Sequence, residues 1–199
     1  MPSKSFNLRT LIAFARRFGF KNAASAIAAE MLKGPEFHVE TQYGTFVSNR
    51  DDWAFYQLAF SWPKIESLAQ LVPVETLNLI ILDIGANLGL FSLMAKNHVP
   101  GSEIHAFEPS SRACSFIRRN VSVDIRLNEV CVGELEGVVD FFEAAESLQV
   151  STADPEEAAR WTCEKREVHC VRLDSYLSGL DCVGRFVGKR STIRILPNA

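Results

Sequence analysis

An acidic residue precedes a glycine-bearing loop in the stretch "ILDIGANLGLFSLMA", residues 81–95. Asp83 ends an apolar run, and Gly85, Asn87 and Gly89 follow before a helix-forming segment. In open α/β sheets, the loop at the carboxyl end of a strand borders the ligand crevice, and small residues there let a ligand approach the backbone. The stretch therefore predicts a ligand-binding loop.

The charge of Asp83 indicates which ligand this loop accepts. Dinucleotide-binding loops read G-x-G-x-x-G, so that a pyrophosphate can meet helix-terminal N–H groups, whereas Asn87 replaces the middle glycine here. A carboxylate repels a pyrophosphate but attracts a ligand that carries an ammonium and a sulfonium group. S-adenosylmethionine is such a ligand and is the predicted cofactor. A nicotinamide-dependent dehydrogenase is a distant alternative.

Glu108 supplies a second carboxylate, 25 positions after Asp83, at the end of the run "EIHAFEP". A carboxylate at this place can accept hydrogen bonds from both hydroxyls of a ribose. Each feature alone also has a structural explanation, because G-x-x-x-G can mark close packing and a strand-end acid can cap a helix. Together, on consecutive strand ends, they favour an adenosine cofactor without a pyrophosphate.

The elements that position these residues alternate from residue 79 onward. "LIILD" and "EIHAFEP" are continuous apolar runs, each followed by a helix-like segment, as in parallel strands that helices cover on both faces. "DIRLNEVCVG" predicts a third strand, "VVDFFEA" a fourth extended piece, and "EVHCVRLDSYL" a strand that enters a short helix. The predicted fold is α/β, a Rossmann-like three-layer sandwich.

Residues 1–75 are expected to form an N-terminal cap of helices and a hairpin before the cofactor-binding domain at 76–199. Alternation around Tyr43-Gly44 predicts the hairpin, and residues 51–71 look helical, with Pro63 as a break or restart and Asp51 or Asp52 as the N-cap. An amphipathic helix is predicted near the N-terminus from apolar residues at helical spacing, namely Leu8, Leu11, Ile12, Ala15 and Phe18. The alternative for this basic segment is a mitochondrial transit peptide.

Charge and cysteine usage limit the function classes. Residues 1–33 hold six Lys/Arg against one acid, residues 34–181 hold eleven against twenty-three, and residues 182–199 hold four against none. An acidic central region argues against a nucleic-acid groove. Five cysteines without a C-x-x-C pair and four scattered histidines suggest a cytoplasmic protein with reduced thiols and no metal. No apolar run reaches the roughly 20 residues of a membrane span.

Several stretches, taken in order, resemble the FkbM-type S-adenosylmethionine-dependent methyltransferases, many of which are O-methyltransferases. "LDIGANLGLFSLMA" looks like the cofactor loop of that family, and "FEPSSRACSFIRRNV" is similar to its second strand and helix. "LNEVCVGELEGVVDFF" resembles its third strand and hairpin, and "STADPEEAARWTCEKREVHCVRLDSYL" resembles its Ser-Thr segment and V-x-R-L-D-x-Y-L stretch. The resemblance covers roughly residues 79–177.

The resemblance implies a class I methyltransferase fold and assigns the site. Asp83, Gly85, Asn87 and Gly89 would belong to the loop on the methionine side, and Glu108 to the ribose contact. The acceptor would be a small molecule or a glycan-type compound, and its identity and the oligomeric state stay open. No catalytic base is assigned, since His169 is only an available titratable group and Asp174 is expected to cap a helix near Ser175.

The sequence departs from the family after residue 178. The family continues with a central strand carrying an I-D-x-E-G-type motif, whereas this chain reads "SGLDCVGRFVGKRSTIRILPNA". The residues most similar to that motif, 134–137, lie in the preceding predicted hairpin and are expected to form a turn. Loss of that strand would leave "LIILD" with an unpaired edge and the fold incomplete.

Three explanations of residues 179–199 are open: a truncated or frame-shifted product with a divergent tail, a variant in which "STIRIL" fills the vacant place, or an interaction protein that has lost catalysis. The sharp change from an acidic to a basic composition favours the first. The predicted function is accordingly S-adenosylmethionine-dependent methyl transfer, with an inactive methyltransferase-like fragment or interaction protein as the alternative.

Overall fold

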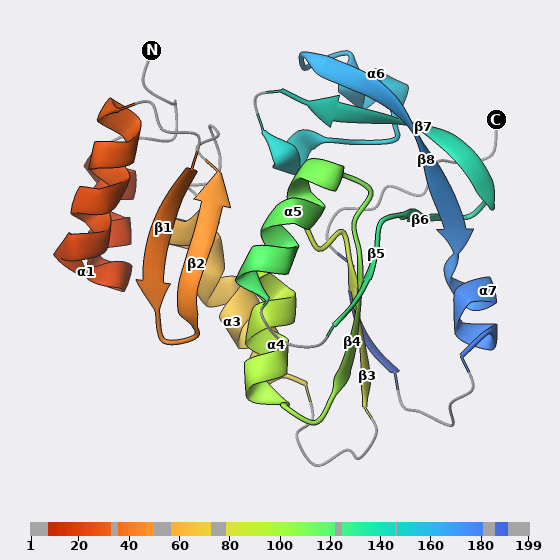
Figure 1. Ribbon diagram of the computed structural model, residues 1–199, viewed down its shortest axis with the longest axis horizontal. Helices are drawn as coiled ribbons and strands as arrows, with labels where there is room; N and C mark the ends of the chain where they lie inside the picture. The colour runs from red at the N-terminus through yellow and green to blue at the C-terminus, as the bar shows by residue number, and fades with distance from the viewer. Residues whose placement is uncertain are drawn as a thin grey trace.

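The computed structural model describes most of the chain, namely residues 8–32, 36–49, 57–72, 79–121, 125–145, 147–180 and 186–190. At its centre lies a four-stranded sheet in the order β5-β4-β3-β9, and all three strand pairs are parallel (Figure 1). The strands are β3 (Ile80–Ile84), β4 (Glu103–Phe107), β5 (Arg126–Asn128) and β9 (Phe186–Arg190). The predicted α/β fold with a parallel sheet is confirmed.

Helices cover the central sheet on one face. Two of them follow β3 and β4 along the chain, α4 (Leu90–His98) and α5 (Ser111–Asn120), as the alternating pattern predicts. All five residues of β3 are buried, since this strand lies inside the sheet and has both faces covered. Ile81 and Ile104 point into the larger core, which also contains the buried side of α4.

The opposite face of the sheet has its own smaller core. Ile80, Leu82, Ile84 and Phe107 pack there against partly buried residues of α7 (Leu173–Ser178) and of neighbouring strands. Inside this layer, His105 is fully buried, with Nε2 2.7 Å from Glu103 Oε1 and Nδ1 3.1 Å from the Tyr176 hydroxyl. The three-layer arrangement of helix, sheet and helix is therefore present around β3 and β4.

A second sheet lies beside the first, in the order β6-β8-β7. Its strands are β6 (Cys131–Gly133), β7 (Gly137–Ala144) and β8 (Cys163–Arg172), and between β7 and β8 lie two short helical turns, η2 (Leu148–Val150) and α6 (Pro155–Ala158). The prediction of one third strand over "DIRLNEVCVG" is wrong, because the chain leaves the first sheet after Asn128 and joins β8 from Cys131 on. The letters at 134–136 form the bend between β6 and β7, as expected.

The edge of β3 that was expected to be unpaired is paired. β9 runs parallel to β3 in a register from Ile80↔Phe186 to Ile84↔Arg190, so the backbone groups of β3 have partners on both sides. The expectation of a vacant place is therefore wrong. The strand that fills it is "FVGKR", whereas "STIRIL" lies outside the described residues.

The described residues of the N-terminal part form α1 (Leu8–Met31), the hairpin of β1 (Glu36–Thr41) and β2 (Gly44–Asn49), a π-helical turn η1 (Gln57–Ser61) and α3 (Trp62–Gln70). The hairpin turns at 42–43, as the alternation predicts. Pro63 lies in the first turn of α3, so it marks a restart of the helix. The possible N-caps Asp51 and Asp52 lie outside the described residues.

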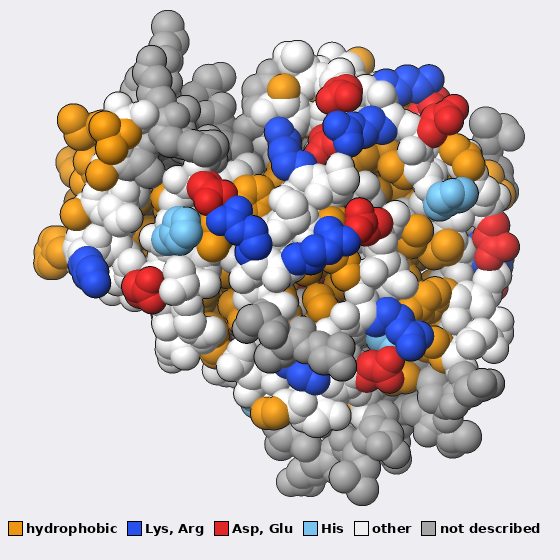
Figure 2. All heavy atoms as spheres, in the orientation of Figure 1, with side chains coloured by type: hydrophobic (Ala, Val, Ile, Leu, Met, Phe, Trp, Pro, Cys, Tyr) orange, Lys and Arg blue, Asp and Glu red, His pale blue; other side chains and the backbone are white. Residues whose placement is uncertain are grey.

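Helix α1 confirms the predicted helix and part of its predicted apolar face, since Leu11, Ala15 and Phe18 pack against the core. Leu8 and Ile12 were expected to face the protein, yet they are 73% and 44% exposed, and Phe14 is the fully buried residue. Gly19, at φ +83°, interrupts the helix, so one heptad-like spacing does not continue through it. Hydrophobic side chains consequently lie on the outer surface over α1, at the upper left of Figure 2.

Phe14 joins the first helix to the hairpin. Its ring lies 4.8 Å from that of Phe18 and 6.4 Å from that of Phe37, measured between centroids. An ion pair between Arg17 and Glu66 links α1 to α3. Within the described part of the chain, no helix is both long enough and apolar enough to span a membrane.

Replacing Phe14 by alanine should lower the free energy of unfolding by about 3–5 kcal/mol, because it removes a fully buried ring. Ile12→Ala is the matched control on the exposed side of the same helix and should cost less than about 1 kcal/mol. Urea unfolding of both variants measures the difference. Equal losses would show that α1 does not pack through Phe14.

Candidate functional site

A cavity of about 330 Å³ lies at the carboxyl ends of β3 and β4. This volume is in the range of small-molecule sites. The predicted cofactor loop forms one wall, and Glu108 with its neighbours forms the next. The remaining wall comes from residues 130–135 and from Leu148, Gln149 and residues 151–154, with Val139, Phe141 and Cys170 behind them. The site therefore lies where both sheets meet.

The loop after β3 turns sharply because three of its residues have positive φ: Gly85 at +73°, Asn87 at +53° and Gly89 at +79°. Asparagine tolerates this conformation better than most residues with a side chain, because its short amide can bond locally. The backbone N–H groups of Gly85 and Ala86 donate to the Phe107 carbonyl, at 2.9 and 3.0 Å. The loop is thereby fastened to the end of β4.

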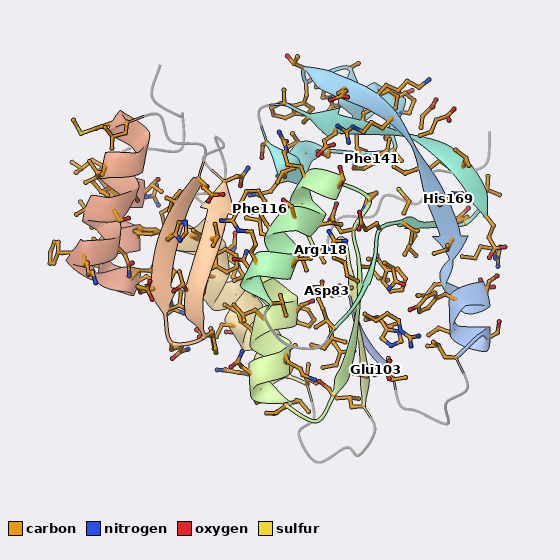
Figure 3. The ribbon with its side chains drawn as sticks, in the orientation of Figure 1. Asp83, Glu103, Phe116, Arg118, Phe141 and His169 are labelled. Carbon is orange, nitrogen blue, oxygen red and sulfur yellow. The ribbon has the colours of Figure 1, made fainter. Side chains whose placement is uncertain are left out.

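Asp83 lies at the bottom of the site. Its side chain is 1% exposed, and Oδ2 accepts a 2.7 Å hydrogen bond from the Ser92 hydroxyl on α4. Figure 3 shows it on β3 of the central sheet, with Phe141 on the second sheet, and both residues line the cavity. A buried carboxylate at this place makes the floor of the cavity negative.

Glu108 is held by the backbone on both sides. Oε2 accepts from the Asn87 N–H at 2.8 Å, and Oε1 accepts from the Ser110 N–H at 2.9 Å. Burial raises the pKa of Glu108 to about 7, the two backbone hydrogen bonds oppose this shift, and the negative charges of Asp83 and Glu143 add to it. Each carboxylate oxygen has a second lone pair, so Glu108 can still accept a hydrogen bond from a ligand.

Asn87 has a buried polar atom without a partner. Its Oδ1 makes no hydrogen bond among the described residues, although its backbone N–H serves Glu108. A buried acceptor left unpaired costs free energy, unless a ligand or water supplies the donor. Together with two carboxylates on one cavity, this atom fits a ligand that brings several N–H or O–H donors, as an aminoacyl-nucleoside does.

Gly89 differs from the other predicted site residues, because it does not line the cavity. A Cβ there would lie 2.9 Å from Val121 Cγ2 and 3.4 Å from Ile117, so glycine allows α4 to begin close to the end of α5. The structure thus brings Asp83, Gly85, Asn87 and Glu108 together around the cavity and places Gly89 behind them.

The titratable groups considered as bases do not reach the cavity. His169 is exposed on β8, far from Asp83 in Figure 3, and neither it nor Asp174 lines the site. The helix expected near Ser175 begins at Leu173, and Asp174 is paired with Arg172 while also accepting from the Ser175 N–H. The expectation that Asp174 caps this helix is therefore wrong: the N-cap is Arg172, and it makes no side-chain capping hydrogen bond.

Sequence reasoning missed three polar residues that shape the site: Ser92, Ser110 and Asn120. The Asn120 side chain bonds the N–H and carbonyl of Val47 and the carbonyl of Leu88, at 2.6, 2.9 and 2.9 Å, so it joins the N-terminal hairpin to the cofactor loop. Ser110 precedes a helix and could have been identified as an N-cap. No sequence pattern signals the other two.

Comparison with known proteins supports the predicted resemblance. No family model matches the chain. The chain is 32% identical over 84 residues to 31-O-demethyl-FK506 methyltransferase FkbM from Streptomyces tacrolimicus, covering 41% of this chain and 32% of that protein. The resemblance to FkbM-type methyltransferases is thus confirmed for this segment, and the match spans about a third of that relative's length.

A solved structure, the precorrin-6y C5,15-methyltransferase from Geobacter metallireducens GS-15, overlaps 53% of this chain and 85% of its own. The sequence identity is 14% and the TM-score 0.30.

The packing role of Gly89 can be tested by Gly89→Ala. The substitution combines a positive φ with a close contact to Val121 and should lower the free energy of unfolding by about 2 kcal/mol. Gly101→Ala is the control, because a Cβ there meets nothing within 4 Å. If urea unfolding gave the same stability for both variants, α4 and α5 would not approach each other at Gly89.

Proposed function

We propose that this chain binds S-adenosylmethionine in the cavity and transfers its methyl group to an oxygen of a small-molecule or glycan-type acceptor. One observation carries the proposal: Asp83 and Glu108, at the ends of adjacent parallel strands, are buried carboxylates that line one cavity. A buried pair of negative groups is costly unless a cationic or donor-rich ligand uses it. The 84-residue match to an FkbM methyltransferase supports the same conclusion.

Each of the two carboxylates would contact a different part of the cofactor. Asp83, held by Ser92, would attract the positively charged methionine portion, while Glu108 would accept hydrogen bonds from the ribose hydroxyls. The Asn87 amide oxygen, which has no partner among the described residues, would accept a further hydrogen bond. Residues with small or no side chains, Gly85 and Ala86, would let the ligand approach the backbone.

The bound cofactor supplies an electrophilic methyl group on a positively charged sulfur. The chain's own contribution would be to hold the reactants in line and to keep water away, for which the apolar wall that includes Leu135 and Phe141 is suited. Among the acids that line the cavity, Asp154 is occupied in capping α6, since it accepts from the N–H groups of Glu156 and Glu157. Glu134 also lines the cavity, and no base is assigned among these acids.

A second candidate function is cofactor binding without transfer. It is favoured by the strand that occupies the place beside β3, "FVGKR", which contains no acid where the resemblance predicts an I-D-x-E-G-type motif. Formation of S-adenosylhomocysteine by the purified chain with an acceptor library distinguishes the two, because a protein that only binds would release none.

Titration calorimetry with S-adenosylmethionine tests the proposed site. Asp83→Ala and Glu108→Ala should each raise the Kd by about tenfold to a hundredfold, because each removes a charged hydrogen-bond partner. Asp140→Asn is the control: this carboxylate pairs with Lys165 at 2.9 Å on the outside of β7 and β8. Unchanged affinity in both site variants would overturn the assignment.

Cofactor binding should weaken at acid pH. The pKa of Glu108 is raised to about 7, so its protonated form dominates below pH 7 in the free protein. Because a ribose contact needs the carboxylate, the Kd should rise by up to about tenfold per pH unit below pH 7 and level off above it. The titratable groups around Glu108 are Asp83 on β3, Glu143 on β7, Cys114 on α5 and Cys131 on β6.

Calorimetry between pH 5.5 and 8.5 measures this dependence. Glu108→Gln is the control, because it keeps the shape of the side chain and removes its proton equilibrium. A wild-type Kd that does not change across this range, or a dependence that persists in Glu108→Gln, would contradict the role given to Glu108.

A further inference from the structure

Glu143 on β7 is a buried carboxylate outside the cavity. A single residue, Ser110, connects it to Glu108. The Glu143 side chain is 6% exposed, and Oε1 accepts a 2.5 Å hydrogen bond from the Ser110 hydroxyl. The N–H of the same Ser110 donates to Glu108 Oε1 at 2.9 Å. A continuous chain of hydrogen bonds therefore runs from the hairpin of β7 and β8 to the proposed ribose contact.

Two arginines from different elements accompany Glu143. Arg112 of α5 has Nε 3.6 Å from Oε1, and Arg166 of β8 has Nε 3.5 Å from Oε2. The same arginines also bond the opposite elements, since Arg112 donates to the Ala144 carbonyl at 2.7 Å and Arg166 to the Ser111 hydroxyl at 3.0 Å. These contacts join β7, β8 and the first turn of α5.

The cluster exceeds what helix capping requires. Ser110 caps α5 by accepting from the Ala113 N–H at 3.0 Å, and its buried hydroxyl also needs an acceptor for its own proton, which a neutral oxygen could supply as well as a carboxylate. Burying Glu143 for this purpose would be unfavourable, because a desolvated carboxylate is costly even when it is paired. The position of this group accounts for its presence, because the Ser110 residue that it holds also donates its N–H to Glu108.

We propose that Glu143, held by Arg112 and Arg166, is a positioning residue that orders Ser110 and through it orients the Glu108 carboxylate toward the cofactor ribose. The inference rests on the proposed function of the site and deepens it. The hairpin of β7 and β8, which already forms part of the cavity wall, thereby sets the geometry of a residue on the other sheet. Folding of the second sheet and affinity for the cofactor become linked.

Three substitutions separate hydrogen bonding from charge. Glu143→Ala removes the acceptor of the Ser110 hydroxyl, and Ser110→Ala removes its donor, so each should raise the Kd for S-adenosylmethionine by about tenfold. Glu143→Gln retains an acceptor oxygen and should bind within about threefold of wild type at pH 8. Asp140→Asn on the same strand is the matched control and should bind as wild type does.

The action through Glu108 is tested by a double-mutant cycle. If Glu143 acts by orienting Glu108, Glu143→Ala should change the Kd little when Glu108→Gln is already present. Additive losses in the two variants, or wild-type affinity of Glu143→Ala, would overturn the proposal.

A measurement without cofactor keeps this inference separate from the proposed function. Hydrogen exchange followed by NMR should show the Ser110 amide exchanging about tenfold faster in Glu143→Ala than in wild type, with no change in Asp140→Asn. Unchanged exchange at Ser110 would overturn the ordering role. If the wild-type chain bound no S-adenosylmethionine, the proposed function would fail, while the exchange rates would still decide whether Glu143 orders Ser110.

Discussion

The site depends on one constraint, the need to satisfy the buried carboxylate of Glu108. Its two oxygens take N–H groups from different segments, Asn87 before α4 and Ser110 before α5. A carboxylate 7% exposed would be strongly unfavourable without such donors. The positive φ of Asn87, and the hydrogen bonds that hold Gly85 and Ala86 to the Phe107 carbonyl, are the backbone arrangement that brings the Asn87 N–H to this side chain.

The same principle extends outward from Glu108 to the rest of the molecule. Asn120, at the far end of α5, uses its amide to join Val47 of the hairpin to the Leu88 carbonyl of the loop. Ser110, at the near end, joins the loop to the second sheet through Glu143. Buried polar groups thus connect the N-terminal elements and the second sheet to the cavity, where apolar packing alone would specify position less uniquely.

The parts that could be predicted from sequence are those with a local signal. Continuous apolar runs identified β3 and β4, and a strand-end acid followed by glycines located the loop, because these patterns follow from burial on two faces and from the turn itself. The split of the third strand into β5 and β6 could not be predicted, since either half can pair as a strand. Which sheet receives it depends on contacts with β4 and β8.

Other errors have the same tertiary origin. Leu8, Ile12 and Phe14 are all apolar, and contact with Phe37 of the hairpin, which no local pattern reveals, accompanies the burial of Phe14. Ser92 and Asn120 carry no sequence signal because their partners lie 9 and 73 residues away. Gly89 was assigned to the ligand loop by resemblance, and its close approach to Val121 is a packing role that neither the resemblance nor its spacing predicts.

The strand that pairs with β3 has to meet one requirement for the fold and a different one for catalysis. Backbone N–H and carbonyl groups of a central strand need partners, and β9 supplies them in parallel register whatever its side chains are. An acid beside the transferred methyl group, by contrast, has to come from one particular side chain, and the strand "FVGKR" contains no acidic residue. The sheet can therefore be complete around Asp83 and Glu108 while the residues beside β3 differ from those of the family it resembles, so the proposed cofactor binding and the proposed methyl transfer depend on different residues.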